Sequence, residues 1–214
     1  MKLTPKIEKL IEKATPLGNT WNSVHIRYTM LMRKAEVLVK ERISGERKGL
    51  PGEPAYMHSF RVYQDVNRLH HWDDPDLELF LAALLHDIVE DGGVSFEELV
   101  DIGFPGKTIR LIYLCTHDKT IKNHTERWML MIAGLVEARN DDAWTIKLAD
   151  LTDNLKQSEG LSQEDRKFMV EVKAPILLRL TEDFDNWTRR WRNELRDEML
   201  KQRDVISRED KIKT

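Results

Sequence analysis

The stretch LAALLHDIVEDGG, residues 81–93, joins an apolar run to a group of ionisable side chains. Its first five residues are Leu or Ala and predict a buried helix. The ionisable residues that follow are His86, Asp87, Glu90 and Asp91. Carboxylates are seldom buried without a partner. A cation is the simplest partner, so the stretch predicts a metal-ion site at the end of a core helix.

Composition narrows the class of protein. A chain of 214 residues can form one substantial core, so a single domain is expected. Its 34 basic and 37 acidic residues nearly balance, so we expect no nucleic-acid partner. The single cysteine, Cys115, excludes an internal disulfide framework and a cysteine-rich zinc site. No apolar run could span a bilayer or serve as a secretory signal, which favours a cytoplasmic location without membrane contact.

Hydrophobic spacing is helical along almost the whole chain, and no convincing alternating strand appears. This pattern predicts an all-α, single-domain multi-helix bundle. Residues 44–54, SGERKGLPGEP, contain three Gly and two Pro and predict a loop. Helices are expected at about Lys6–Ala14, Trp21–Ile43, His58 to His70–His71, Leu77–Asp91, a short segment after Ser95, Gly106–Thr116, Asn123–Arg139, Ala143–Lys156 and Gln163–Phe184.

The end of the chain differs in composition from the rest. Residues 185–214 are highly charged but keep an apolar stripe formed by Trp187, Trp191, Leu195 and Met199. Such a stripe predicts a solvated helix packed on the body of the protein. We therefore expect a main domain over residues 1–184 and a charged helical tail over 185–214, which either belongs to that domain or faces a partner.

Two distant segments offer the ligands that a metal ion near His86 and Asp87 would still need. Successive residues on a helix point about 100° apart, so this pair shares an ion only if other elements complete the shell. His58 opens a helix directly after the Gly/Pro-rich loop, and Asp150 lies in the apolar helix AWTIKLADLTDNLKQ. Lys147, on nearly the same face as Asp150, suits either a nearby carboxylate or a phosphate group.

Three segments together resemble the HD-domain metal-dependent phosphohydrolases, and more closely the hydrolase domain of the RelA/SpoT family. That domain removes the 3′-pyrophosphate of the alarmone (p)ppGpp. The segments are GERKGLPGEPAYMH, AALLHDIVED and KLADLTDN, and the similarity covers roughly Met32–Gln157. THDKT, residues 116–120, is similar to the small animal members. The chain has no room for a synthetase half, so it resembles a stand-alone small alarmone hydrolase of HD-domain type.

The resemblance implies a role for each matching residue. One divalent ion, usually manganese, is held by His58, His86, Asp87 and Asp150. The attacking water is oriented or deprotonated by Glu90 and Asp91. The purine nucleotide is contacted by Arg47, Lys48 and Asn154, with Lys147 as a further candidate. Two imidazoles and two carboxylates suit iron, zinc or cobalt as well as manganese.

Three departures from the family pattern keep other functions open. Leu151 stands where the family usually has a basic residue. Gln157 stands where many long members have a threonine, and Gly92 where a threonine commonly follows the Glu–Asp pair. A different purine alarmone therefore stays open as the substrate. A second function also stays open, that of an HD-domain nucleotidase acting on nucleoside monophosphates, dNTPs or a 3′-phosphorylated nucleotide such as NADPH. A third possible function is that of a non-catalytic module that sequesters an alarmone. A homo-oligomer is compatible with each of these functions.

Overall fold

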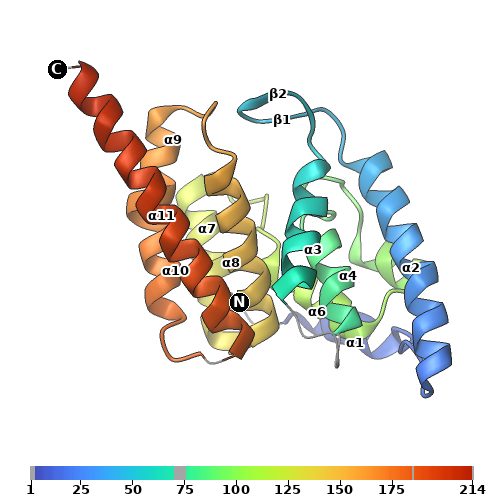
Figure 1. Ribbon diagram of the computed structural model, residues 1–214. Helices are drawn as coiled ribbons and strands as arrows, with labels where there is room; N and C mark the ends of the chain where they lie inside the picture. Colours follow the sequence, from blue (N-terminus) through green and yellow to red (C-terminus); the bar gives the residue numbers. More distant parts are fainter. Residues whose placement is uncertain (1–2, 70–75, 185, 214) are drawn as a thin grey trace.

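The structure is a computed structural model and describes residues 3–69, 76–184 and 186–213 (Figure 1). The expected all-α class is confirmed, with one small hairpin added to the helices. In chain order the elements are α1 (Pro5–Lys13), α2 (Trp21–Arg42), β1 (Glu46–Arg47), β2 (Leu50–Pro54), α3 (Met57–Leu69), α4 (Leu77–Leu85), α5 (Phe96–Ile102), α6 (Gly106–Cys115), α7 (His124–Ala138), α8 (Asp141–Lys156), α9 (Gln163–Phe168), the π-helical turn η1 (Met169–Lys173), α10 (Ala174–Leu180) and α11 (Asn186–Lys213).

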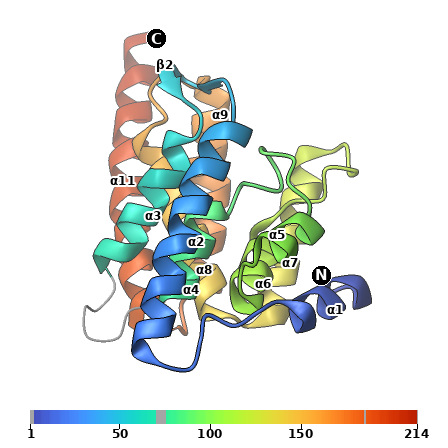
Figure 2. The ribbon, with the colours of Figure 1, turned by 90° about the vertical axis from the view of Figure 1, so that its right-hand side faces the viewer.

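Helix α8 lies inside the bundle and packs against α11, α3 and α6. The long helices α2 and α11 lie on opposite sides of the molecule, with α3, α4 and α8 between them (Figure 1). Figure 2 shows α1, α5 and α6 grouped together near the N-terminus, where they contact one another. None of the described helices is long and apolar enough to cross a membrane.

Helices α4 and α8 form the centre of the core because they are buried on nearly every side. All residues from Leu79 to Leu85 are buried, as is every α8 residue from Ala143 to Asp153. Burying one Leu-sized side chain is worth about 1.5–3 kcal/mol, so these two helices are the most firmly held parts of the molecule. They therefore provide rigid supports for the polar residues that they carry.

Side-chain caps begin two helices where the sequence predicts helix N-termini. Asp76 Oδ1 accepts a hydrogen bond from the Leu79 N–H at 3.0 Å at the start of α4. Ser95 Oγ accepts one from the Glu98 N–H at 3.1 Å at the start of α5. Each cap satisfies a backbone donor that the helix itself leaves unpaired. The expected end of α3 at His70–His71 lies outside the described residues.

The expected helix Leu77–Asp91 was wrong at its C-terminal end, because α4 stops at Leu85. Residues 86–91 form a tight turn in which the Ile88 N–H donates to the Leu85 carbonyl at 2.9 Å. The chain then folds back so closely that a Cβ at Gly92 would lie 2.6 Å from the Ile88 carbonyl oxygen. Gly93 follows with a φ of +64°, which favours glycine. The turn thus directs the polar residues away from the helix axis.

Two further expectations need correction. Residues 44–54 are not only a loop, because β1 and β2 pair antiparallel within them. β1 has only two residues, and the two prolines and the glycine of β2 hide the usual strand pattern. The expected helix Gln163–Phe184 is interrupted by η1, where the Ala174 N–H donates to the Met169 carbonyl, five residues back. Pro175 has no N–H to continue the regular pattern, which explains the break.

Candidate metal and nucleotide site

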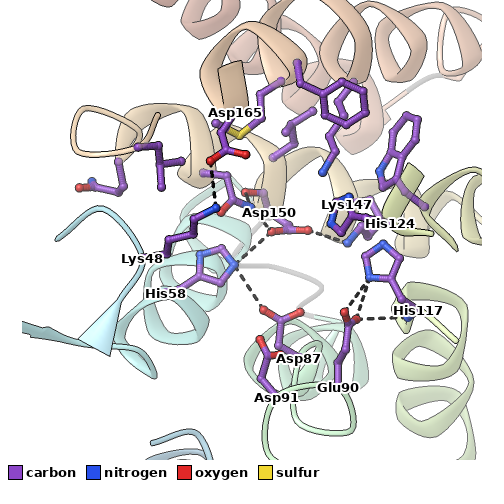
Figure 3. Close-up of a pocket in the computed structure, with 18 of the residues that line it drawn as sticks. Lys48, His58, Asp87, Glu90, Asp91, His117, His124, Lys147, Asp150 and Asp165 are labelled. Carbon is purple, nitrogen blue, oxygen red and sulfur yellow. Dashed lines mark hydrogen bonds and ion pairs between the residues drawn. The ribbon is translucent and has the colours of Figure 1, made fainter. Parts of the chain in front are cut away.

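Three helices bring four ionisable side chains to one buried point. His58 is the second residue of α3, and Asp150 lies within α8. His86 is the C-cap of α4, and Asp87 follows it in the turn. Figure 3 shows that His58, Asp87 and Asp150 point toward one another from separate elements. The structure therefore brings together all four residues that the sequence predicts as metal ligands.

The ligand atoms of these residues lie close to one another. His58 Nε2 lies 3.1 Å from Asp150 Oδ1, 3.6 Å from Asp87 Oδ2 and 3.3 Å from His86 Nε2. His86 Nε2 lies 3.1 Å from Asp87 Oδ2 and 4.0 Å from Asp150 Oδ1. With metal–ligand bonds of about 2.1 Å, neighbouring ligands lie about 3.0–3.4 Å apart and opposite octahedral ligands about 4.2 Å. Ligand atoms of His58, His86 and Asp87 all lie within 4.8 Å of one another, which suits one divalent ion, and Asp150 lies beside them through its contact with His58.

Hydrogen bonds at the outer ring nitrogens orient both imidazoles. His58 Nδ1 lies 2.7 Å from Asp153 Oδ2, and His86 Nδ1 lies 2.8 Å from the Ala83 carbonyl oxygen. Both partners are acceptors, so each Nδ1 carries a proton and donates it. In the neutral rings the two Nε2 lone pairs then face each other and the two carboxylates. Four such acceptors need a positive charge between them, a proton or a metal ion, and this donor set fits a divalent metal.

The electrostatics of this cluster favour positive charge. Burial opposes protonation of His86, but the carboxylates of Asp87 and Asp150 outweigh it and raise the pKa of His86 to about 9. Burial likewise opposes ionisation of Asp150, yet Lys147 and the two imidazoles keep its pKa well below the usual range. The carboxylates are therefore ionised at neutral pH, as metal ligands must be.

Asp153 and Arg61 support the cluster and were missed in the sequence. Asp153 accepts from His58 Nδ1 and also from Arg61 Nε at 2.7 Å, while Arg61 NH1 donates to Glu53 at 2.8 Å. Such partners orient a ligating histidine and fix its tautomer. Asp153 lies three residues after Asp150 in LADLTDN, on the same side of the helix. That spacing was the signal that could have identified it.

Glu90 and Asp91, the expected water-handling pair, lie beside the cluster and are held by the loop between α6 and α7. The Nδ1 of His117 donates to the Glu90 carboxylate at 2.8 Å, and the His117 N–H donates to the same group at 3.2 Å. Lys119 lies 3.2 Å from Asp91 Oδ1. Burial raises the pKa of Asp91, and the charge of Asp87 adds to that rise. His117 is thus a direct partner of Glu90, a role that the sequence motifs did not identify.

The four expected nucleotide-binding residues are also gathered here. Arg47 of β1 donates to the Asn154 side-chain oxygen, and Asn154 Nδ2 donates to Asp150 Oδ1 at 2.6 Å. Lys147 Nζ lies 2.6 Å from Asp150 Oδ2, so its carboxylate partner is confirmed. Lys48, at the hairpin turn, pairs with Asp165 at 2.9 Å. Each of these residues lines the cavity described next.

A cavity of about 430 Å³ opens beside the cluster. Its wall includes three of the four ligand residues, the acidic pair and residues of α7, α9, η1 and α10. Two of the departures from the family pattern, Leu151 and Gln157, also line it, as expected for positions near a nucleotide. Gly92, the third departure, does not line the cavity. It packs instead against Ile88 and Arg42.

The hairpin is fixed over this cavity by a backbone contact. A Cβ at Gly160 would lie only 1.9 Å from the Gly49 carbonyl oxygen. Gly49 has a φ of +84°, in the left-handed region that glycine tolerates. The two glycines thus allow the hairpin turn and the segment after α8 to touch. This contact holds Arg47 and Lys48 at the cavity.

Comparison with known proteins places this site in a family. The HD domain family model matches residues 55–155, which contain all four candidate ligands and the acidic pair. The zebrafish (Danio rerio) guanosine-3′,5′-bis(diphosphate) 3′-pyrophosphohydrolase MESH1 is 30% identical over 136 residues, covering 63% of this chain and 72% of the relative. The human MESH1 protein is 28% identical over 152 residues, covering 69% and 82%.

A bacterial relative and a solved structure agree with this match. The Aquifex aeolicus guanosine-3′,5′-bis(diphosphate) 3′-pyrophosphohydrolase is 30% identical over 156 residues, but the chain spans only 21% of that relative's length. A solved structure of a metazoan ortholog of SpoT, reported to hydrolyze ppGpp, matches this chain with a TM-score of 0.67 at 27% identity. The matched region covers 81% of this chain and 94% of the chain in that structure. The chain therefore belongs to the HD-domain family of guanosine-3′,5′-bis(diphosphate) 3′-pyrophosphohydrolases that includes the MESH1 proteins.

Proposed function

We propose that this protein is a metal-dependent 3′-pyrophosphohydrolase of (p)ppGpp or a closely related purine alarmone. One observation carries the proposal: His58, His86 and Asp87 lie close enough together to share a divalent ion, with Asp150 beside them, at the wall of a cavity lined with cationic side chains. Water would cleave the bond that joins the 3′-pyrophosphate to the nucleotide. The products are pyrophosphate and GDP from ppGpp, or GTP from pppGpp.

The four ligand residues would hold one ion, which we propose to be Mn²⁺. Mixed imidazole and carboxylate ligands suit manganese among the available divalent metals. When bound, such an ion neutralises charge on a phosphoryl oxygen and makes a water molecule more acidic. The chain itself provides the orientation, because hydrogen bonds fix both imidazoles and Lys147 fixes Asp150.

Glu90 and Asp91 would manage the proton of the attacking water. Burial alone would raise the pKa of Glu90, but the hydrogen bond from His117 outweighs burial and lowers it. Glu90 is thus ionised near neutral pH and can accept a proton. The raised pKa of Asp91 suits a group that holds a proton and can donate it to the leaving oxygen.

Arg47, Lys48, Lys147 and Asn154 would bind the nucleotide. A substrate with several phosphate groups attracts the cations of the hairpin, and Arg47 can donate two parallel hydrogen bonds to one phosphate. The existing partners of Arg47 and Lys48 hold both side chains at the cavity before substrate arrives. This arrangement favours the alarmone over nucleoside monophosphates, which carry fewer charges.

We also propose that the charged tail belongs to the same domain and that the protein acts in the cytoplasm without a nucleic-acid partner. Trp191, Leu195 and Ile206 of α11 are buried, and α11 packs along α8. These contacts support one body over residues 1–184 and 185–214. The nearly balanced charge supports the absence of a nucleic-acid partner, and the buried free Cys115 supports a cytoplasmic location.

A substrate panel separates this proposal from its alternatives. The purified protein is incubated with Mn²⁺ and, separately, (p)ppGpp, (p)ppApp, NADPH, dNTPs and nucleoside monophosphates, and products are resolved by ion-exchange chromatography. We expect pyrophosphate and GDP from ppGpp. Phosphate from monophosphates or NADPH, or triphosphate from dNTPs, with ppGpp left intact would support the nucleotidase reading. Binding of ppGpp without turnover would support sequestration.

A further inference from the structure

Lys173 borders the cavity in an unusual setting. Its Nζ lies 5.7 Å from the ring centroid of Trp128 and 5.6 Å from that of Phe168. Among the residues that the structure describes, none forms a hydrogen bond or ion pair with it. Aromatic faces stabilise a positive charge, but they leave the three N–H donors of an ammonium without oxygen acceptors. Those donors are free for a ligand.

The other cations of the cavity are engaged. Their partners are Asn154 for Arg47, Asp165 for Lys48, Asp150 for Lys147 and Glu90 for His117. The acidic groups whose charges act on Lys173 are Asp150, Asp165 and Glu90, and these belong to that same set of pairs. Burial, and then the charge of Lys147, lower the pKa of Lys173. A bound anion would supply the missing acceptor and counter-charge.

The backbone directs Lys173 toward the cavity. Lys173 ends η1, the turn in which the Ala174 N–H bonds to the Met169 carbonyl instead of following the regular helical pattern. Met169, four residues before Lys173, and Leu177, four residues after it, also line the cavity. Residues at this spacing share one face of a helix. The position of Lys173 therefore follows from the local fold.

An anion suits this place better than a base stacked on Trp128. Trp128 is only 4% exposed, so its indole has no free face of useful size for a nucleobase. Lys173 also forms no hydrogen bond or ion pair with His58, His86, Asp87 or Asp150, so it is not a member of the metal cluster. We propose that Lys173, set between Trp128 and Phe168, binds the 5′-phosphate groups of the nucleotide while the metal cluster acts on the 3′-pyrophosphate. This inference rests on the proposed function.

Kinetics with two substrates test the assignment. Guanosine 3′,5′-bis(diphosphate) and guanosine 3′-diphosphate, which lacks the 5′ phosphates, are compared for the wild type, Lys173→Met and Lys173→Arg. Charged hydrogen bonds of this kind predict a KM for the first substrate raised roughly tenfold to hundredfold in Lys173→Met, with kcat little changed. The KM for the second substrate should stay within about twofold, and Lys173→Arg should lie near the wild type.

The matched control is Lys167→Met, since Lys167 of α9 pairs with Asp210 outside the cavity. It should leave both KM values unchanged. Equal effects of Lys173→Met on the two substrates, or no effect on either, would overturn the assignment. Melting curves of Lys173→Arg and Lys173→Met show whether both variants fold. If the methionine variant does not fold, the arginine variant still tests whether a positive charge at this position is sufficient.

A binding measurement separates failure of this inference from failure of the proposed function. GDP with Mn²⁺ is titrated calorimetrically into the wild type and Lys173→Met. At least a tenfold weaker GDP affinity in the variant supports the 5′-phosphate site, even if the wild type cleaves neither guanosine compound and the proposed function fails. Cleavage by the wild type together with equal GDP affinities would instead keep the proposed function and remove the role of Lys173.

Discussion

His117 Nδ1 lies 2.8 Å from both carboxylate oxygens of Glu90, and its backbone N–H bonds to the same carboxylate. The two residues are 27 positions apart and join the turn after α4 to the loop after α6. The hydrogen bond fixes the orientation of Glu90 beside the cluster and keeps it ionised. His117 is therefore a positioning residue for the proposed proton acceptor.

Replacing His117 with Ala should change the pH profile. Without this hydrogen bond the pKa of Glu90 rises, so the acidic limb of kcat/KM, where Glu90 must be ionised, moves to higher pH. We expect kcat to fall about tenfold to hundredfold with bound metal unchanged. His117→Gln, which can still donate to Glu90, should recover part of the rate. An unmoved acidic limb would argue against the positioning role.

Glu90→Gln should keep the metal and lose turnover. The amide preserves shape but cannot accept a proton from water, so kcat should fall at least about a hundredfold. Metal content and melting temperature should match the wild type because Glu90 lies outside the four ligands. The kcat of Asp91→Asn, measured in parallel, shows how much each of the two carboxyl groups contributes to turnover. Full activity in Glu90→Gln would remove its assigned role.

Asp153→Asn should weaken metal binding without touching a ligand. Asp153 accepts from both His58 and Arg61, and a neutral amide cannot serve both donors equally well. Loss of such a partner typically lowers metal affinity about tenfold to hundredfold. Competition with a chelator measures this affinity. Asp65→Asn, a partly buried α3 carboxylate that pairs with Lys156 at 3.4 Å, is the control and should leave it unchanged.

Gly160→Ala should impair nucleotide binding through the hairpin. The added methyl group would meet the Gly49 carbonyl oxygen, so the hairpin turn must move away from the cavity. Because Arg47 and Lys48 move with it, we expect KM to rise about tenfold while metal affinity stays the same. Glu159→Ala, at the neighbouring exposed residue, should have no such effect. An unchanged KM in Gly160→Ala would show that the hairpin position does not matter.

Much of this fold follows from the sequence, because periodic apolar residues specify helices. The start of α4 at Leu77 and its buried interior were both predicted, the interior from its unbroken apolar run. The end of α4 was not predicted. The turn after Leu85 is defined by its own hydrogen bonds, and helical spacing alone does not distinguish it from a further turn of helix. The break at η1 depends on a single proline, Pro175, which also suits the first turn of a helix.

The candidate site divides in the same way. Motifs that combine polar residues with an apolar helix identified the four converging ligands. Supporting residues were harder to find, because His117 and Arg61 become significant only through partners far along the chain. Lys173 carried no sequence signal at all, since a lysine within a helix that bears several charges is ordinarily solvated. Tertiary contacts, which no single segment encodes, define these roles.

The central claim is that His58, His86, Asp87 and Asp150 hold one divalent ion, and metal content tests it most directly. Protein stripped with a chelator is loaded with Mn²⁺, passed over a desalting column and measured by mass spectrometry of the metal. We predict one ion per chain in the wild type and in His25→Ala, whose imidazole lies on α2 away from the cluster. His86→Ala and Asp150→Ala should retain none. A wild type without metal, or variants that keep it, would contradict the account.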